Sequence, residues 1–283
     1  MLDGLASSAG TAWARLTEKR SVWFASHSLE LEFMECRPST SIAKYSDPDE
    51  HHGEWVHTRG THDVPLPASF AVSKYLVTNS LYLQFVAAGG YEDNSLWTVS
   101  APSRTRLITG DGRSLGPASW PSATMFPEGH AHHPVSGISY YEARAFVEWC
   151  NRVATDTAGQ VISLPDENLW EFAARGESGL TYPWGDAFDV DKCNCAEQKI
   201  GGTSRVDQFA SGASPFGCCD MAGNVWEFVH ASDVGSDSCA MRGGSYLNSR
   251  SEVRAYLRLI GVPRWHRAPD FGVRLMLIAP PAR

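Results

Sequence analysis

The sequence predicts an α+β protein with little regular secondary structure, in which a few short helices are followed by many packed turns. The 283 residues include 25 glycines, 16 prolines and 10 tryptophans, a composition that favours loops anchored by large aromatic side chains. Beyond Gly176 the apolar runs are short and are separated by Gly, Pro, Ser and Asp. We therefore expect two or three helices and then a half of the chain that is rich in loops and poor in strands.

Each predicted helix carries signals at its ends. The segment 78–90, TNSLYLQFVAAGG, begins with a capping residue and stops at two glycines. In SYYE, Ser139 and Glu142 form a capping box, and the apolar residues that follow recur on one helical face. A third helix is predicted from about Asp166 and is closed by Gly176.

The chain length allows one large domain or two small ones. We interpret residues 1–64 as an N-terminal extension that packs on a main domain of residues 65–283. Within the extension, residues 36–66 are polar and rich in histidine, and they are interpreted as a loop. A strand is predicted at 70–78, FAVSKYLVT, and a long irregular excursion at 92–131.

Charge and composition exclude several classes of partner. The formal net charge is −8 and the basic residues are scattered, so a sequence-independent nucleic-acid surface is not expected. No apolar run is long enough to span a membrane, and MLDGLASSAG lacks the features of a signal peptide. We therefore expect a cytoplasmic protein without a membrane partner. Seven cysteines, an odd number without a CxxC pair, predict mostly reduced thiols and give little support to a zinc site.

Histidines and cysteines are the first candidates for chemistry. Imidazole nitrogens could hold iron, copper or zinc, but the spacing fits no helical pair, so solvated loop histidines are favoured over a metal site. The histidines concerned are His51, His52, His57, His62, His130, His132 and His133. Cys193 and Cys195, in KCNCAE, either share a metal or are structural, and the structural reading is favoured. The adjacent Cys218 and Cys219 are read as two small apolar side chains.

The segment DMAGNVWEF predicts an oxygen-rich turn. Gly223 and Asn224 would make a tight turn that leaves backbone carbonyls unpaired, and Glu227 follows three residues later. Such a turn suits calcium, although hydrogen bonds of Glu227 within the turn are the alternative. The arginines near the C-terminus form either an anion site or structural pairs with carboxylates, and pairs are favoured. They are Arg254, Arg258, Arg264, Arg267 and Arg274.

Seven segments, in order, resemble one family. They are SKYLVTNSLYLQFVAAGGY, HPVSGISYYEARAFVEWC, SLPDENLWEFAARG, YPWGD, DMAGNVWEF, RGGSY and DFGVRL. The chain resembles the formylglycine-generating enzymes, or sulfatase-modifying-factor domains, over about residues 65–277. The resemblance implies a variant of the C-type lectin fold, with a small twisted antiparallel sheet and two or three flanking helices. It also implies a calcium site at Gly223, Val225 and Glu227.

The same resemblance argues against the family's best-known chemistry. Its copper enzyme, which oxidises a sulfatase cysteine to formylglycine, has active cysteines directly after RGGSYL and five residues later. Asn248 and Val253 stand there, so neither copper nor formylglycine generation is expected. The family's iron-dependent sulfoxide synthases take histidines from a separate N-terminal domain, and only about 65 residues precede the family region here.

We therefore predict a non-catalytic module that binds an unknown protein or small molecule through its C-terminal loops, like the variable proteins of diversity-generating retroelements. The candidate ligand-binding residues are Tyr246, Asn248, Arg250, Glu252, Arg258, Arg264, Trp265, His266 and Asp270. One alternative is a metal-dependent oxidoreductase that uses His51, His57, His62 or the group His130–His133. Another is a subunit of a larger assembly, with residues 92–131 as a contact surface.

Overall fold

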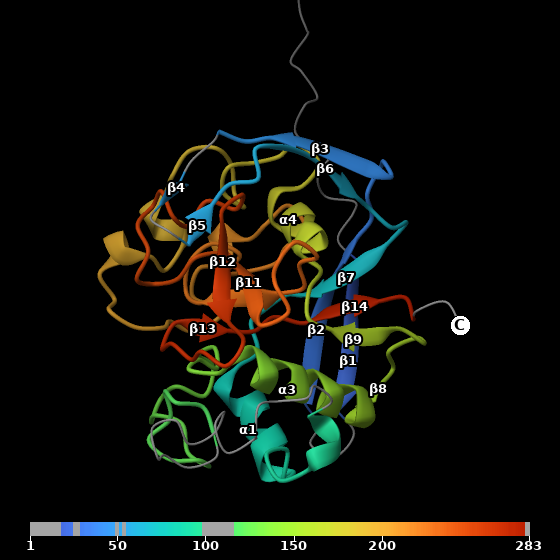
Figure 1. The fold of residues 1–283 in the computed structure, drawn as a ribbon, viewed down its shortest axis with the longest axis vertical. Coiled ribbons are helices and arrows are strands. Elements are labelled where there is room, and N and C mark those ends of the chain that lie inside the picture. Colours follow the sequence, from blue (N-terminus) through green and yellow to red (C-terminus); the bar gives the residue numbers. More distant parts are fainter. Residues whose placement is uncertain (1–17, 25–28, 49–50, 53–54, 98–115, 281–283) are drawn as a thin grey trace, which may run out of the picture.

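A computed structural model describes residues 18–24, 29–48, 51–52, 55–97 and 116–280 (Figure 1). The described residues contain three α-helices, which are α1 (Asn79–Ala87), α3 (Tyr140–Val153) and α4 (Glu167–Arg175). Single turns of 3-10 helix add η2 (Asn94–Leu96), η3 (Val190–Lys192), η4 (Ala196–Gln198) and η5 (Ala210–Gly212). None of the helices in this part of the chain is long and apolar enough to cross a membrane.

The first sheet joins strands from both ends of the chain. Its neighbouring strands are antiparallel throughout. In spatial order they are β8 (Ala154–Thr155), β1 (Lys19–Phe24), β2 (Leu29–Cys36), β7 (Phe70–Ser73), β14 (Met276–Ile278) and β9 (Val161–Ser163). The last described strand, β14, therefore lies inside this sheet, between β7 and β9, and the sheet also contains the first strands, β1 and β2.

The second sheet carries the C-terminal loops. Its pairs are antiparallel except for the parallel pair of β10 and β13. In spatial order its strands are β13 (Phe271–Gly272), β10 (Trp226–Val229), β11 (Ser238–Arg242), β12 (Arg258–Pro263), β5 (Val56–His57) and β4 (His51–His52). The chain between β11 and β12 forms a loop that holds four of the predicted ligand-binding residues, Tyr246, Asn248, Arg250 and Glu252. Of the others, Arg258 begins β12, and Arg264, Trp265, His266 and Asp270 follow that strand.

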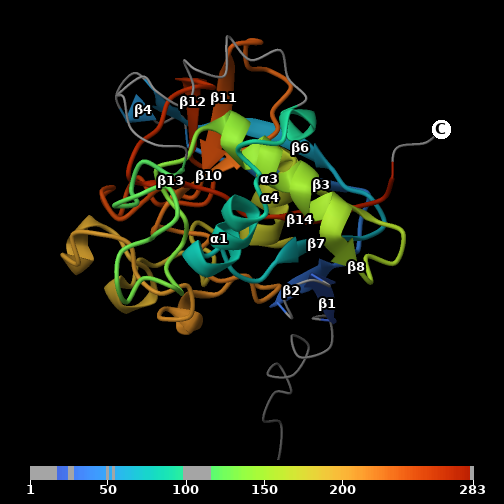
Figure 2. The ribbon, with the colours of Figure 1, turned by 90° about the horizontal axis from the view of Figure 1, so that it is seen from below.

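The predicted starts of the three helices and the end of α4 are confirmed, whereas α1 ends at Ala87, shortly before the predicted glycine stop. The Thr78 side chain caps α1, both hydrogen bonds of the Ser139–Glu142 capping box are present, and Gly176 ends α4 with a positive φ of 62°. Figures 1 and 2 show α1 and α3 side by side at one end of the fold. An aromatic cluster lies between them, in which the rings of Tyr82 and Phe146 stack with centroids 5.1 Å apart.

Two expectations about strands are wrong. Residues 36–66 are not only loop, because β3 (Ile42–Ser46) and β6 (Thr61–Pro65) pair as an antiparallel two-stranded sheet. In β3, buried Ala43 and Tyr45 alternate with exposed residues, and this short alternation is hidden among polar neighbours. The C-terminal half is also not poor in strands, since β10 to β14 all lie there. The prediction of reduced thiols agrees with the structure: all seven cysteines fall within the described residues, and each is a buried free thiol.

Candidate functional site

Arg242 and two glycines fix the start of the C-terminal loop. Arg242, at the end of β11, is fully buried, and its Nε donates to Glu167 Oε1 at 2.9 Å while Nη2 donates to Glu171 Oε2 at 2.9 Å. Gly244 has a φ of 72°, and a Cβ there would lie 2.8 Å from Cγ1 of Val253. Only glycine fits, so the two ends of the loop pack directly against each other.

The loop from Ser245 to Val253 is held by its own side chains. Asn248 Oδ1 accepts from the Ser245 backbone N–H at 3.0 Å, and Glu252 Oε2 accepts from the Ser249 backbone N–H at 2.9 Å. Neither side chain is therefore free of the loop. Val253 is completely buried. The two positions of the family's cysteines thus hold a turn-forming amide and a core residue.

A short chain of hydrogen bonds leads from the loop to Asp270. Ser245 Oγ lies 2.8 Å from Asn248 Oδ1 and 2.7 Å from Asp270 Oδ2, yet a hydroxyl has only one proton to donate. Burial raises the pKa of Asp270. A protonated Asp270 would donate to Ser245 Oγ, which would donate in turn to Asn248.

Other predicted ligand residues differ in accessibility. Trp265 and Leu247 have 57% and 59% of their surface exposed, and Leu247 was not among the predicted residues. Arg250 and His266 are exposed, while Tyr246 is half-buried. The His266 ring contacts the Trp265 ring at a centroid distance of 5.9 Å. The accessible part of the predicted site therefore consists mainly of aromatic and apolar side chains.

The C-terminal arginines are structural, as favoured from the sequence. Arg258, predicted to bind a ligand, is buried and donates to Glu167 Oε2 at 2.8 Å and to Asp233 Oδ1 at 2.7 Å. Arg264 donates from Nε to the Ser238 carbonyl at 2.9 Å. Both guanidinium groups thus have partners inside the protein, and Arg258 is buried. The order of the residues in the sequence does not reveal this burial.

Glu227 is the centre of a buried ion pair. Its Oε2 accepts from Arg274 Nε at 2.8 Å and from Trp170 Nε1 at 2.6 Å, and its Oε1 accepts from Arg274 Nη2 at 2.9 Å. Glu227 and Arg274 are both completely buried. The carboxylate predicted to bind calcium therefore already has a strong bidentate partner.

Unpaired oxygens lie close to the same turn. Asp220 Oδ1, Asn194 Oδ1 and Ser204 Oγ are buried and have no hydrogen-bond partner. Asn224 connects these residues, because its Nδ2 donates to Asp220 Oδ2 at 3.1 Å and its Oδ1 accepts from the Ser204 backbone N–H at 3.0 Å. Oxygen donors of this kind are the ligands of hard cations. Asp220 was missed because only the glycine turn and Glu227 were considered.

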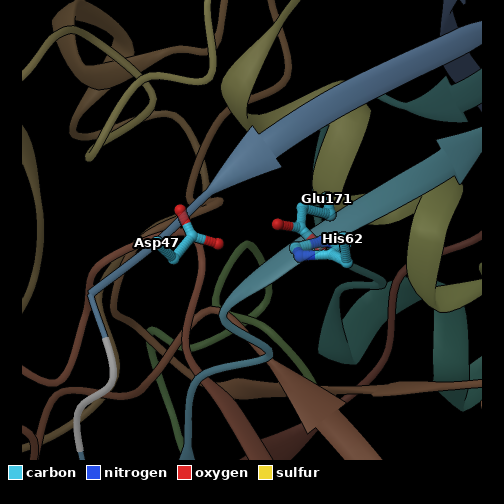
Figure 3. A group of neighbouring side chains, drawn as sticks. All are labelled: Asp47, His62 and Glu171. Carbon is cyan, nitrogen blue, oxygen red and sulfur yellow. The ribbon is translucent and has the colours of Figure 1, made fainter.

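Among the described residues, one group of three side chains has the spacing of metal ligands. Asp47, which follows β3, His62 of β6 and Glu171 of α4 place their ligand atoms within 4.8 Å of one another (Figure 3). However, Arg175 donates to Asp47 Oδ1 and to Glu171 Oε1, each at 2.6 Å, and Arg242 donates to Glu171 as well. The carboxylates are thus paired with guanidinium groups.

His62 is best described as a cation. Its Nε2 lies 3.1 Å from Glu171 Oε2 and its Nδ1 lies 2.9 Å from the Gly60 carbonyl oxygen, so that only the doubly protonated ring can donate to both. Burial lowers the pKa of His62, but the hydrogen bond and charge of Glu171 outweigh it and raise the pKa. An imidazolium has no lone pair for a metal, which argues against His62 as a ligand.

The remaining histidines form no such group within the described residues. The ring centroids of His130 and His133 lie 4.3 Å apart. Nδ1 of His130 is hydrogen-bonded to the Glu128 carbonyl oxygen, and Nδ1 of His133 is hydrogen-bonded to Thr203 Oγ1. His51 lies in β4 and His57 in β5. Much of the predicted contact surface 92–131 falls outside the described residues.

The fold and sequence comparisons agree on a class. The structure is similar to Treponema denticola variable protein 1, with a TM-score of 0.62 at 16% identity over 91% of this chain and 98% of that one. It is also similar to PvdO from Pseudomonas aeruginosa, with a TM-score of 0.63 at 18% identity over 87% and 94% of the two chains. The predicted α+β fold of the C-type lectin type is therefore confirmed.

The sulfatase-modifying factor enzyme 1-like domain matches residues 40–278, and the chain belongs to this family. It is 31% identical over 128 residues to the inactive C-alpha-formylglycine-generating enzyme 2 of Mus musculus. The aligned region covers 41% of this chain and 38% of that protein. The chain thus spans about two fifths of that relative's length. It is 29% identical to the formylglycine-generating enzyme of Mycobacterium tuberculosis, over 60% and 69% of the two chains. A hercynine oxygenase of Mycolicibacterium smegmatis is 27% identical, and the aligned region covers 60% of this chain and 39% of the oxygenase.

Proposed function

We propose that the protein is a non-catalytic binding module that presents its C-terminal loops to a protein or small-molecule ligand. The observation that supports this most directly is the loop after RGGSY. Asn248 bonds to the backbone of its own loop and Val253 is fully buried, so neither position presents a reactive group. The similarity to the mouse relative, whose name calls it inactive, supports the absence of catalysis in this proposal.

Exposed side chains at the loops define the proposed binding surface, namely Leu247, Arg250, Trp265 and His266. Leu247 and Trp265 are two of the large apolar side chains that remain more than half exposed. Trp and Arg are frequent anchors of interfaces because they combine a large contact area with a polar group. A partner with an apolar patch and an acidic or polar rim fits this surface. The hercynine oxygenase relative supports a metal-dependent oxidoreductase as the alternative.

Trp265→Ala is expected to abolish capture of a partner and to leave the melting temperature within about 2 °C, because an exposed side chain contributes little to stability. The measurement is affinity purification from the source cells with tagged wild type and variants, followed by mass spectrometry. Trp23→Ala is the matched control, since Trp23 is 42% exposed on β1, and it should retain the partner. Loss of folding in Trp265→Ala would make Trp265 a core residue. If the purified protein contained stoichiometric copper or iron and oxidised a cysteine-containing peptide, the alternative of a metal-dependent oxidoreductase would be favoured.

We also propose that a calcium ion is bound beside the GNVWE turn. The buried, unpartnered oxygens of Asp220, Asn194 and Ser204 support this proposal, together with the strain-tolerant Gly223, which has a φ of 83°. Gly223 and Val225 belong to the same turn and could add carbonyl oxygens. Glu227 is the weakest of the originally predicted ligands, since Arg274 occupies both of its oxygens. The ion would stabilise the scaffold on which the loops are mounted.

The calcium proposal predicts an unusual pH dependence. Burial raises the pKa of Asp220 from 3.8 to about 7, so the folded state binds this proton more tightly than the unfolded state does. Without calcium, the free energy of unfolding should therefore fall as the pH rises from about 4 to about 7. Calcium replaces the proton and should raise the melting temperature at pH 8 more than at pH 5. Asp220→Asn should lose both effects; identical melting curves with calcium and with EGTA would contradict the proposal.

A further inference from the structure

Three groups that can carry a positive charge surround the side chain of Tyr140. Tyr140 is the first residue of α3 and is buried. The Arg264 guanidinium lies over its ring, with Cζ 5.0 Å from the ring centroid, and Nδ1 of His230 lies 3.0 Å from its hydroxyl oxygen. Arg144 is four residues further along α3, so it lies on the same face of the helix and its side chain leans back toward Tyr140. The fold thus brings two guanidinium groups and an imidazole to one place.

The backbone holds His230 and Arg264 in these positions. His230 follows β10, and its N–H donates to the Pro165 carbonyl at 2.8 Å while its own carbonyl accepts from the Glu167 N–H at 2.9 Å. Arg264 follows β12, and its N–H donates to the Asp237 carbonyl at 3.0 Å. Both side chains therefore start from backbone that is hydrogen-bonded to a neighbouring segment, which is the preorganisation that a binding site needs.

Most of the hydrogen-bond donors in this group are unused. Arg264 donates from Nε to the Ser238 carbonyl at 2.9 Å, but within the described residues its two Nη atoms have no partner. The same holds for Nε2 of His230, and Arg144 has only Glu148, at 3.9 Å with both side chains about one-third exposed. These atoms are also not among the described polar atoms that are buried without a partner. They can therefore donate hydrogen bonds to a molecule that arrives from solvent.

The charge around His230 is unbalanced, although the whole chain has a formal net charge of −8. Burial, together with the positive charges of Arg144 and Arg264, lowers the pKa of His230 to about 4. The titratable and charged groups on the elements packed against it are Tyr140, Arg144 and Glu148 of α3, Asp166 and Glu167 at the start of α4, Cys239 of β11, and Arg264. Of these acids, Asp166 caps α4 and Glu167 is paired with other arginines. The positive charge therefore has no matching carboxylate within the group.

We propose that Arg264, His230 and Arg144 form a binding site for a phosphate group. Guanidinium groups recognise phosphate through charge-assisted hydrogen bonds. The three donors come from three separate elements, so they suit a tetrahedral anion, whose oxygens point in several directions, better than a planar carboxylate with two oxygens. A bound anion would neutralise the guanidinium charges and favour the protonated form of His230. The inference does not rest on a partner for the loops, although Arg264 directly precedes the exposed Trp265.

Other roles for this group explain fewer of its contacts. A structural role accounts for Nε of Arg264 and for its position over the Tyr140 ring, but it uses neither Nη atom and leaves Arg144 without a function. A metal site does not fit, because a guanidinium group has no lone pair to offer and repels a cation. An anion site made of the C-terminal arginines alone does not fit either, since Arg258 and Arg274 are bonded to buried carboxylates. The proposed site takes two of its three donors from α3 and from the residue after β10.

The first test is a calorimetric titration of the full chain with inorganic phosphate at pH 7 and constant ionic strength, in which one site per chain is expected. Arg264→Gln should weaken binding by about 10-fold or more, because hydrogen bonds to a charged group are lost. Arg144→Gln should weaken it by about 2–5-fold, since solvent partly screens its charge. Arg205→Gln is the matched control: Arg205 is exposed and paired with Asp207, and this variant should bind like wild type. Phenyl phosphate, titrated in parallel, distinguishes the source: tighter binding than phosphate indicates a phosphate ester, and equal or weaker binding indicates the free ion.

The second test follows the pKa of His230 by NMR, with His230→Gln to identify its imidazole signal. Saturating phosphate should raise this pKa from about 4 toward the ordinary value of 6.5, because a nearby anion stabilises the imidazolium. A purely structural role of the arginines would leave the pKa of His230 unchanged when phosphate is added. The measurement therefore separates a bound anion from a change in packing.

Four results would overturn the proposal. They are the absence of a saturable site below about 10 mM phosphate, which means an adventitious ion only, wild-type affinity in Arg264→Gln, acetate binding as tight as phosphate binding, and an unchanged pKa of His230. Circular dichroism and melting temperature verify that each variant is folded. If Arg264→Gln fails to fold because the contact with Ser238 is lost, Arg144→Glu replaces it. Arg144 is a partly exposed helical position, and reversal of its charge should weaken phosphate binding by about 10-fold or more.

Discussion

Glu227→Ala is expected to lower the free energy of unfolding by about 3–5 kcal/mol, the usual cost of leaving one charge of a buried pair without its partner. The substitution removes the acceptor of both Arg274 and Trp170 at a position with no solvent access. Arg274 also donates to the carbonyls of Ser73 and Cys219, so the change loosens the contact between the two sheets. Urea unfolding followed by tryptophan fluorescence measures the loss.

A surface pair provides the control for Glu227. Glu148 lies 3.9 Å from Arg144 on α3 with 34% of its side chain exposed, and Glu148→Ala should cost less than about 1 kcal/mol. Replacing both partners, as in Glu227→Leu with Arg274→Met, should recover part of the stability lost in the single variant, because no unpaired charge remains. A cost below about 1 kcal/mol for Glu227→Ala would show that Arg274 finds another partner.

Glu171→Ala should have an effect of the same size, about 3–5 kcal/mol, for a different part of the fold. Glu171 is fully buried and accepts from Arg175, Arg242 and His62, so its removal leaves three cationic groups facing one another. Burial would raise the pKa of Glu171, yet these cations lower it to about 2, so the carboxylate is charged throughout the physiological range. The ion pairs join α4 to β6 and β11.

The effect of Glu171→Ala can be measured on the whole protein and on the β3–β6 segment separately. Urea unfolding gives the total loss, and limited proteolysis should show earlier cleavage between β3 and β6, because His62 loses its acceptor on α4. Glu177→Ala is the control, since Glu177 is exposed just beyond the same helix and accepts from the Ser39 backbone N–H. Equal stability of Glu171→Ala and Glu177→Ala would disprove the role of Glu171 in the network.

The sequence predicts the local parts of this fold well and the long-range parts poorly. Helix caps depend on residues three or four apart, so Ser139–Glu142 and Gly176 could be identified directly. The pairing of β3 with β6 was missed, because the segment between them contributes β4 and β5 to another sheet. The contacts of Tyr45 with Gly176 and of His62 with Glu171 are likewise long-range. Similarly, Arg242 meets Glu167 from 75 residues away, and no local pattern records that contact.

The candidate site shows the same division. The loss of the family's cysteines at Asn248 and Val253 is visible in the sequence, and the loop there carries no thiol. Arg258 and Trp265 look equally suitable as ligand residues in the sequence, yet one is buried in ion pairs and the other is 57% exposed. Asp220 was missed for a related reason: a lone acid is noticed only when the structure shows that its oxygen has no partner.

The separation between the buried ion pairs and the exposed loop residues has a consequence for engineering. Leu247, Arg250, Trp265 and His266 belong to none of the buried clusters, whereas Arg242 and Glu227 hold the backbone from within. Substitutions at such surface positions usually change stability by less than about 0.5 kcal/mol. A combinatorial library at these four positions should therefore yield mostly folded proteins, and new specificities could be selected without redesign of the scaffold.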